Sequence, residues 1–206
     1  MSVKKDSPQV LLVEGNDDQH VIWSLLQKYE IAKTFEVVDS KGIEKLLDQL
    51  PVRFKQSDIK TIGIVIDADL NIAARWHKLQ VLLAAEGIML PEIPVSTGTI
   101  VNGQIKFGVW IMPNNQLNGM LEDFIAFLVP DKDALMPIAI DTLNNIEKLH
   151  LNRYIPLHHS KALIHTWLAW QDDPGTPMGL AITKRYLTTD IDICTKFLDW
   201  IRILFS

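Results

Sequence analysis

Acidic residues follow two short apolar runs of the sequence, and their types and spacing suit metal-ion chemistry. Glu14 comes directly after the run QVLLV, and Asp18 follows four residues later. Asp67 and Asp69 come after the run TIGIVI, two positions apart. Carboxylates that converge repel one another unless they take up protons or share a cation. We therefore expect a hard, oxygen-seeking divalent ion, Mg²⁺ or Mn²⁺, to bind them.

The strands and helices that are predicted to position these acids alternate along the sequence. Short apolar runs predict strands at residues 9–13, 35–38 and 61–66, and amphipathic periodicity predicts helices at residues 17–29, 43–50 and 72–86, the second ended by Pro51. This order is typical of parallel βαβ units with helices on both faces of the sheet. Ligands of such sheets bind beyond the carboxyl ends of the strands, where Glu14, Asp67 and Asp69 lie. In an extended chain, residues two apart point to the same side, so we expect Asp67 and Asp69 to converge on one ion.

The pattern changes after residue 90. Asn102-Gly103 is a strong hairpin signal between β-branched residues, so residues 91–113 are expected to form a hairpin that adds an antiparallel edge. Helical patterns follow at residues 120–128, 132–150, 160–170 and 191–204. The predicted fold is thus α/β, a Rossmann-like parallel sheet flanked by helices, with a hairpin at its edge and further helices.

Length and composition indicate one domain. The chain has 206 residues, of which 48% are hydrophobic and 22% charged, values typical of a globular protein with a buried core. Neither a linker nor a repeat interrupts it. We predict a single domain over residues 1–206, in which an α/β core at residues 8–128 carries a helical extension, residues 129–206, packed on the core.

Charge and cysteine content limit the partners and the compartment. The net charge of -5 does not suit a protein that coats nucleic acid by basic charge, so a polyanion would need a local basic patch or a metal bridge. The single cysteine, Cys194, is expected to be a reduced core thiol. No secretory signal or apolar run of about 18 residues is seen, so we expect a soluble cytoplasmic protein without membrane association. The sequence leaves the oligomeric state open.

Acids beside helix starts also have an ordinary structural role. Asn16, Asp17 and Asp18 could serve only to cap the first helix and complement its dipole. Capping explains Glu14 and Asp67 less well, because an unpaired charge beside a core costs on the order of several kcal/mol.

The two acidic segments, LLVEGNDD and IVIDAD, resemble the Toprim domain of bacterial primases, topoisomerases, recombination mediators and overcoming-lysogenization-defect (OLD) nucleases. The signature of that family is an apolar strand ending in Glu-Gly and another ending in Asp-x-Asp. Residues 14–15 and 67–69 match it, within a resemblance covering about residues 8–128.

Three further segments narrow the resemblance. The Glu-Gly-x-x-Asp form and the segment GMLEDFI, which contains Glu122, are closer to OLD-type nucleases and small ribosomal-RNA maturases than to topoisomerases. Through WIMPNNQLNGMLEDF and KALIHTWLAWQDDPGTPMGLAI, nearly the whole chain also resembles a small bacterial family of Toprim-related proteins of unknown function.

The resemblance implies roles for the acids. In Toprim enzymes the glutamate is a general acid or base, and the Asp-x-Asp pair holds Mg²⁺ at a phosphodiester. It implies that Glu14 transfers protons or binds metal, and that Asp67 and Asp69 bind metal. In the two-metal variant, Asp18 and Glu122 would hold a second ion.

Phosphoryl transfer also requires a cation for the developing negative charge. Lys161 is the first candidate, because Ser160 is expected to be an N-cap and a lysine in a first helical turn is unfavourable unless it has a nearby partner. OLD-type nucleases likewise use a lysine after the Toprim core. The alternative for Lys161 is a solvated surface lysine, and Lys41, in a loop beside Gly42, is a second candidate.

Histidines and tryptophans near residue 160 suggest no separate site. His158, His159 and His165 lack zinc-ligand spacing and cysteine partners, so structural or solvent-facing roles are expected. Trp167 and Trp170 are expected to form a core stripe rather than a platform for base stacking.

Three classes of function remain open. The first is a Mg²⁺- or Mn²⁺-dependent phosphodiesterase or nuclease acting on nucleic acid. The second is a non-catalytic module that binds metal and nucleic acid or nucleotide with a partner protein. The third, a phosphoacceptor receiver domain, fits less well, because Glu-Gly precedes the acids and a helical region follows. The sequence has no Gly-x-x-x-x-Gly-Lys-Ser/Thr loop, so a partner ATPase would supply that role, or the substrate is small.

Overall fold

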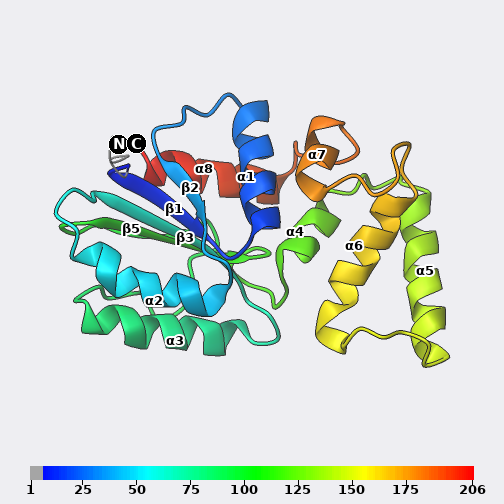
Figure 1. The fold of residues 1–206 in the computed structure, drawn as a ribbon, viewed down its shortest axis with the longest axis horizontal. Helices are drawn as coiled ribbons and strands as arrows, with labels where there is room; N and C mark the ends of the chain where they lie inside the picture. The colour runs from blue at the N-terminus through cyan, green and yellow to red at the C-terminus, as the bar shows by residue number, and fades with distance from the viewer. Residues whose placement is uncertain (1–6) are drawn as a thin grey trace, which may run out of the picture.

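A five-stranded sheet forms the centre of the structure, a computed structural model that describes residues 7–206 (Figure 1). Its strands are β1 (Gln9–Val13), β2 (Glu36–Asp39), β3 (Thr61–Asp67), β4 (Thr99–Val101) and β5 (Lys106–Met112), in the order β2-β1-β3-β5-β4. The first three strands and β5 are parallel, whereas β4 runs antiparallel to β5. The predicted α/β fold is confirmed.

Helices cover both faces of this sheet. The helices of the described residues are α1 (Asn16–Lys28), α2 (Ile43–Phe54), α3 (Ile72–Ala85), α4 (Leu121–Phe127), α5 (Leu135–Lys148), α6 (His159–Ala169), α7 (Met178–Thr183) and α8 (Asp192–Leu204), with a 3-10 turn (Pro156–His158) before α6. In Figure 1, α2 and α3 lie on one face, and α1 and α8 lie on the other.

Alternation along the strands divides the apolar side chains between two cores. On β1, Val10 and Leu12 join the core under α2 and α3, whereas Leu11 and Val13 join the core under α1 and α8. Successive side chains of a strand point to opposite faces, so a strand buried on both faces must be apolar throughout. The uninterrupted apolar runs of the sequence have this physical origin.

Helix α8 approaches the sheet closely because two strand positions lack side chains. A Cβ atom at Gly63 would lie 2.8 Å from Leu204 Cδ2, and one at Gly108 would lie 2.5 Å from the same methyl carbon. Larger residues would push the helix outward. Helix α8 is therefore a layer on the sheet.

The remaining helices of the extension lie beyond the carboxyl ends of the strands rather than over the sheet. Figure 1 shows α5 and α6 side by side at that end, next to α4, while α7 packs against α1. Ala139 of α5 and Ile164 of α6 belong to the same core cluster as the buried residues of α1 and α8. This position brings α6 close to the edge where the acids lie.

The hairpin predicted for residues 91–113 is confirmed, because β4 pairs antiparallel with β5 and forms an edge of the sheet. Its second strand, β5, also pairs in parallel with β3 and so lies inside the sheet. The predicted end of the second helix is wrong. Pro51 does not end the second helix, which continues to Phe54. The Phe54 ring lies 5.5 Å from that of Phe107, so core packing in the last turn offsets the hydrogen bond that proline cannot donate.

The lone cysteine is a core group, as expected. Cys194 of α8 is fully buried, and burial raises the pKa of its thiol to about 12, which keeps it protonated and unreactive. Helices that combine the length and the apolar character required to cross a membrane are absent from residues 7–206.

Candidate functional site

The ends of β1 and β3 bring Glu14 and Asp67 into contact. The backbone N–H of Asp67 donates a hydrogen bond to Glu14 Oε1 at 2.8 Å, across 53 residues of chain. The N–H of Leu121, the first residue of α4, donates to Asp67 Oδ1 at 3.0 Å. The two carboxylates therefore lie together at the carboxyl edge of the sheet, against the start of α4.

Asp18 adds a third carboxylate from the first turn of α1. Its Oδ2 accepts a hydrogen bond from the N–H of Gly15 at 3.1 Å, so it does cap the helix, as the structural alternative predicts. Its Oδ1, however, is buried without a hydrogen-bond partner, and the residue is only 7% exposed. A capping role thus accounts for one oxygen of this carboxylate and leaves the other unexplained.

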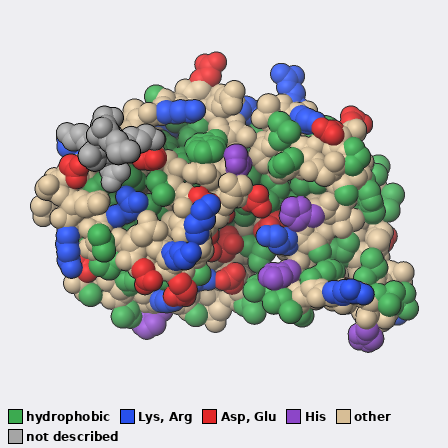
Figure 2. All heavy atoms as spheres, viewed as in Figure 1, with side chains coloured by type: hydrophobic (Ala, Val, Ile, Leu, Met, Phe, Trp, Pro, Cys, Tyr) green, Lys and Arg blue, Asp and Glu red, His purple; other side chains and the backbone are tan. Residues whose placement is uncertain are grey.

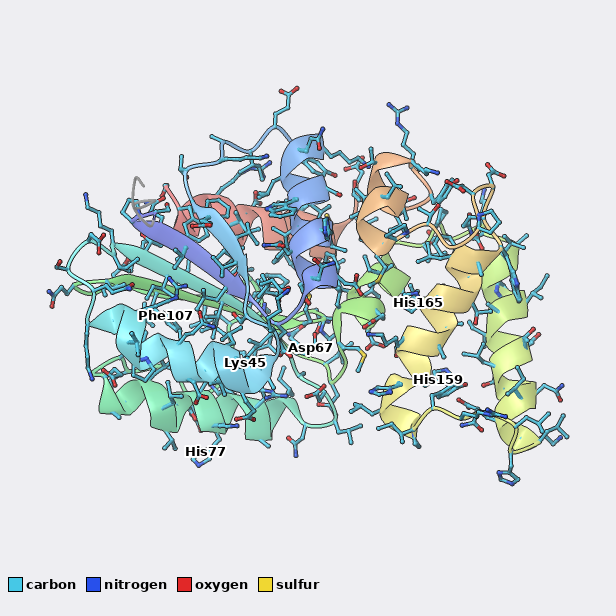
Figure 3. The ribbon with its side chains drawn as sticks, viewed as in Figure 1. Lys45, Asp67, His77, Phe107, His159 and His165 are labelled. Atoms are coloured by element: carbon cyan, nitrogen blue, oxygen red, sulfur yellow. The ribbon has the colours of Figure 1, made fainter. Side chains whose placement is uncertain are left out.

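Glu122, in the first turn of α4, completes a group of four carboxylates, which we call the acidic cluster: Asp18 and Glu122, which are buried, and Glu14 and Asp67, which are partly buried. Glu122 is 4% exposed, and its charge acts on both Asp18 and Asp67. Figure 3 shows Asp67 at the end of the sheet that faces α6, where His159 and His165 lie. Figure 2 shows acidic side chains near the middle of this face, with basic and histidine side chains on either side.

Burial and mutual repulsion raise the pKa values within the acidic cluster. Burial raises the pKa of Asp67 well above its ordinary value, and the charges of the other three cluster members add to the effect. Burial and the charges of Glu14 and Glu122 raise the pKa of Asp18 to about 7. Burial also raises the pKa of Glu14, offset in part by the Asp67 N–H and by the charge of Arg75. A cation in this position would remove the repulsion.

Asp69 does not point with Asp67 as the extended-chain argument predicts. Its φ is +53°, and its backbone N–H and C=O pair with Gly119 at 2.9 and 2.8 Å, so the extended geometry ends at Asp67. The side chain of Asp69 forms an ion pair with Arg75 of α3. Its charge still contributes, as the smallest influence, to the raised pKa of Asp67, so Asp69 lies at the rim of the acidic cluster.

Arg75 is a site residue that the sequence analysis did not single out. Its guanidinium pairs with Asp69, and its positive charge lowers the pKa of Glu14. A usable signal was present, because the helix that follows an acidic strand end starts at the same edge of the sheet. A basic residue in its first turns is therefore placed near the acids.

Lys161 contacts the acidic cluster from α6. Its Nζ lies 3.4 Å from Glu122 Oε1, although half of the lysine side chain is exposed. Ser160 is not the N-cap that we expected, because α6 begins at His159 and the Ser160 hydroxyl instead donates to Asp123 at 2.5 Å. Lys161 still lies in the first helical turn and has the nearby negative partner that this position favours.

Lys41, the second candidate cation, lies in the loop between β2 and α2. That loop is held to the site, because the N–H of Gly42 donates to the backbone carbonyl of Glu14 at 2.7 Å. The Lys41 ammonium group itself pairs with Asp39 at 2.5 Å and is largely exposed. Lys41 is therefore engaged outside the acidic cluster, in contrast to Lys161.

The histidines near residue 160 have the expected structural or solvent-facing positions. His158 and His165 are exposed, and His159 pairs with Glu147 of α5 at 2.7 Å. The prediction of a core stripe is confirmed for Trp167, which is fully buried, and is wrong for Trp170, which is 40% exposed at the end of α6.

The acidic cluster offers the donor atoms that a hard cation prefers. Its side chains, however, are not arranged to coordinate an ion in this structure. Among residues 7–206, no three Asp, Glu, His or Cys side chains form a group that could hold a metal ion as they stand. One oxygen each of Glu14, Asp18 and Asp67 faces a backbone N–H instead. All the donors are carboxylate oxygens, which Mg²⁺ and Mn²⁺ prefer, and the unpartnered Asp18 oxygen is available for coordination.

Comparison with known proteins gives one relationship. No curated protein and no solved structure matches the chain. A family model described as "Protein of unknown function (DUF3226)" matches residues 8–206, nearly the whole chain. The chain belongs to the DUF3226 family.

Proposed function

We propose that this protein is a Mg²⁺- or Mn²⁺-dependent phosphodiesterase or nuclease that acts on nucleic acid. The observation that carries the proposal is the acidic cluster, four carboxylates from separate elements, three of which have raised pKa values. A fold keeps such a cluster at a cost in stability, which a bound cation offsets. The resemblance of the two acidic segments to the Toprim signature supports the same function.

The residues of the site suit distinct roles in this reaction. Asp67, Asp18 and Glu122 would hold the cation, with Asp69 as a further ligand if it leaves Arg75. The ion, when bound, would polarise a phosphoryl oxygen and lower the pKa of a bound water. Burial raises the pKa of Glu14 above its ordinary value, which favours a role for this carboxyl group in proton transfer.

Lys161 is the cation placed to stabilise negative charge on the phosphate. Its partner Glu122 lies in the acidic cluster, while half of its own side chain remains exposed to an incoming substrate. An ammonium group at this position would favour the extra charge that develops on phosphoryl oxygens in the transition state.

A non-catalytic module that binds metal and nucleic acid or nucleotide with a partner protein, such as an ATPase, is the second candidate. The pairing of Lys161 with Glu122 favours it, because a lysine neutralised by a carboxylate contributes less to binding phosphate. The net charge of -5 also makes tight unaided binding of nucleic acid unfavourable. Either function is proposed for the cytoplasm, where a free thiol such as Cys194 stays reduced.

Calorimetric titration with Mn²⁺ and Mg²⁺ tests the metal site without assuming a substrate. We expect the wild type to bind, Asp67→Asn to lose binding, and Asp69→Asn to bind more weakly than the wild type. Asp192→Asn, on an exposed helix start, is the matched control and should bind as the wild type does. Absence of binding by the wild type, with or without an oligonucleotide present, would overturn the proposal.

A cleavage assay then separates the two candidate functions. Labelled single-stranded DNA, duplex DNA, RNA and bis(4-nitrophenyl) phosphate are incubated with the wild type and with Glu14→Gln in Mn²⁺. Metal-dependent cleavage that Glu14→Gln reduces by about 100-fold or more would support the enzyme, in line with the usual contribution of acid–base groups. Metal and oligonucleotide binding without cleavage of any of the four would support the module instead.

A further inference from the structure

A cavity of about 350 Å³ lies on the α3 side of the acidic site. One wall is formed by Ile72, Ala73 and Trp76 of α3, and Ile93 with Pro94 forms a second wall from the segment that follows this helix. Asn115, in the loop from β5 to α4, lines the remaining side. This size and mainly apolar lining are typical of small-molecule sites in proteins.

The cavity is held open by hydrogen bonds in its walls. The Pro91 carbonyl accepts from Trp76 Nε1 at 3.0 Å and from Gln80 Nε2 at 2.8 Å, which fixes the second wall to α3. On the opposite side, the N–H of Asn115 donates to the Ile111 carbonyl at 2.8 Å. A preformed cavity of this kind requires little ordering when a ligand binds.

Asn115 presents one hydrogen-bond donor that the fold does not use. Its Oδ1 accepts from the N–H of Ile111 at 2.7 Å, so the amide orientation is fixed and Nδ2 is the remaining group. Nδ2 is buried without a partner, and Asn115 is only 2% exposed. An unsatisfied buried donor costs about 1–3 kcal/mol, which an acceptor on a ligand would recover.

The cavity and the acidic cluster share their supporting loops. Asp69 lies three residues before Ile72, and the N–H of Ile72 donates a hydrogen bond to Asn118 Oδ1, in the loop before α4, at 2.9 Å. The loop that contains Asn115 continues through Gly119, which pairs with Asp69, into α4 and Glu122. A ligand in the cavity would therefore lie beside a phosphate at the acidic cluster.

We propose that this cavity binds a nucleobase of the substrate, an inference that rests on the proposed function. A base offers two flat apolar faces to the side chains of Ile72, Trp76 and Ile93, and its edge offers nitrogen or carbonyl acceptors. Because the Oδ1 atom of Asn115 is already engaged, this residue can only donate, so it selects an acceptor on the base edge. The cavity thus supplies base contacts that the acidic cluster cannot make.

Saturation-transfer NMR on the full chain in metal-free buffer tests this site independently of the acidic cluster. The probes are adenosine, guanosine, cytidine and uridine, with ribose for comparison. We expect saturation of base protons for at least one nucleoside and no signal from ribose. Ala73→Phe, which fills the cavity, should weaken binding about tenfold or more, equal to 1.4 kcal/mol. Ala74→Phe, exposed on the next position of α3 and outside the lining, is the matched control and should bind normally.

A second variant removes the donor alone. Asn115→Asp keeps an oxygen for the N–H of Ile111 but lacks the amide hydrogens, and we expect it to weaken nucleoside binding about tenfold. Ribose binding equal to nucleoside binding, no nucleoside binding at all, or nucleoside binding unchanged by both cavity variants would overturn the inference. Absence of metal binding by the wild type would overturn the proposed function and leave the nucleoside result unaffected, so the two proposals fail separately.

Discussion

The pKa values of carboxylates are shifted in opposite directions in the acidic cluster and at Glu147 of α5. Glu147 accepts hydrogen bonds from the Tyr154 hydroxyl at 2.8 Å and pairs with His159 at 2.7 Å, and these contacts lower its pKa. In the acidic cluster, burial and like charges raise the pKa values of Glu14, Asp18 and Asp67. The fold thus supplies hydrogen-bond and ion-pair partners for the carboxylate in the α5–α6 region, whereas the carboxylates at the edge of the sheet have too few such partners.

This difference separates a structural role from a functional one. Glu147 joins α5 to the segment before α6 and to α6 itself, and no ligand is needed to explain its contacts. The acidic cluster stabilises the fold poorly as it stands, because Lys161 and Arg75 offset only part of its negative charge and buried charges that are not fully compensated are costly. Sites that oppose local stability in this way are commonly those at which ligands bind or reactions occur.

The largest expected effect concerns pH and the Asp18→Asn variant. Asp18 has an ordinary pKa of 3.8 and a pKa of about 7 in the folded protein, so between these values the native state binds more protons than the unfolded state. The free energy of unfolding of the metal-free protein should therefore fall as pH rises from about 4 to about 7. The expected loss from this group is on the order of a few kcal/mol, since each pKa unit corresponds to about 1.36 kcal/mol.

Urea unfolding in EDTA at pH 5 and pH 8 measures this dependence. Asp18→Asn should reduce it, with the remainder due to Glu14 and Asp67, whereas Asp17→Asn, the exposed neighbour on α1, should leave it unchanged. A wild type that is equally stable at the two pH values, or more stable at pH 8, would contradict the view that the cluster has too few counterions.

The second effect is stabilisation by metal. An ion at about 100 times its Kd adds about 2.7 kcal/mol to the free energy of unfolding when it binds only the native state. At pH 8, Mn²⁺ should raise the Tm of the wild type and should leave that of Asp67→Asn unchanged, as measured by differential scanning calorimetry. Ca²⁺ serves as a comparison ion with the same charge. A Tm rise of equal size in Asp67→Asn would locate metal binding elsewhere in the molecule.

The positions of the acids at the strand ends could be predicted from the sequence, whereas the positions of the residues around them could not. Glu14 and Asp67 could be placed together, because apolar runs define strands and parallel strands end at one edge. The direction of Asp69 could not, since its left-handed backbone is set by pairing with Gly119, fifty residues away. Likewise, α7 has only six residues, too few for periodicity to be recognised, and its position depends on packing against α1.

Glu122 and Asn115 show the same limit for the candidate sites. Glu122 reaches the acidic cluster because α4 begins against Asp67, a tertiary contact that only the family resemblance could suggest. Asn115 has no sequence signal at all, because its importance lies in an amide group left without a partner by the surrounding fold. Sequence patterns specify elements and their order, whereas such contacts depend on how the loops pack.

The third effect concerns Lys161, a half-exposed cation that pairs with the buried acid Glu122. Its surroundings therefore match neither those of the acidic cluster nor those of Glu147. If it stabilises charge on the substrate, Lys161→Gln should reduce kcat about tenfold or more, equal to at least 1.4 kcal/mol, with a smaller change in KM. The metal affinity should be retained, since Lys161 is not a ligand. Lys196→Gln on the exposed face of α8 is the control, and a loss of kcat of similar size in both variants would exclude a specific role.

The smallest expected effect comes from Glu147→Gln, which changes the carboxylate that was compared with the acidic cluster. The amide oxygen can still accept from Tyr154 and His159, so only the charge is lost, and an exposed pair contributes little to stability. Because the pKa of Glu147 is lowered from its ordinary 4.5, its charge contributes to the free energy of unfolding at neutral pH. This contribution is lost as the pH falls through the pKa of the folded state, which is the opposite pH dependence to that of Asp18. Tm measured at pH 7 and pH 3 should show a small decrease at pH 7 only, with Mn²⁺ binding unchanged. A change in Mn²⁺ binding would mean that the α5–α6 region and the acidic cluster are coupled, which the separate partners of Glu147 argue against.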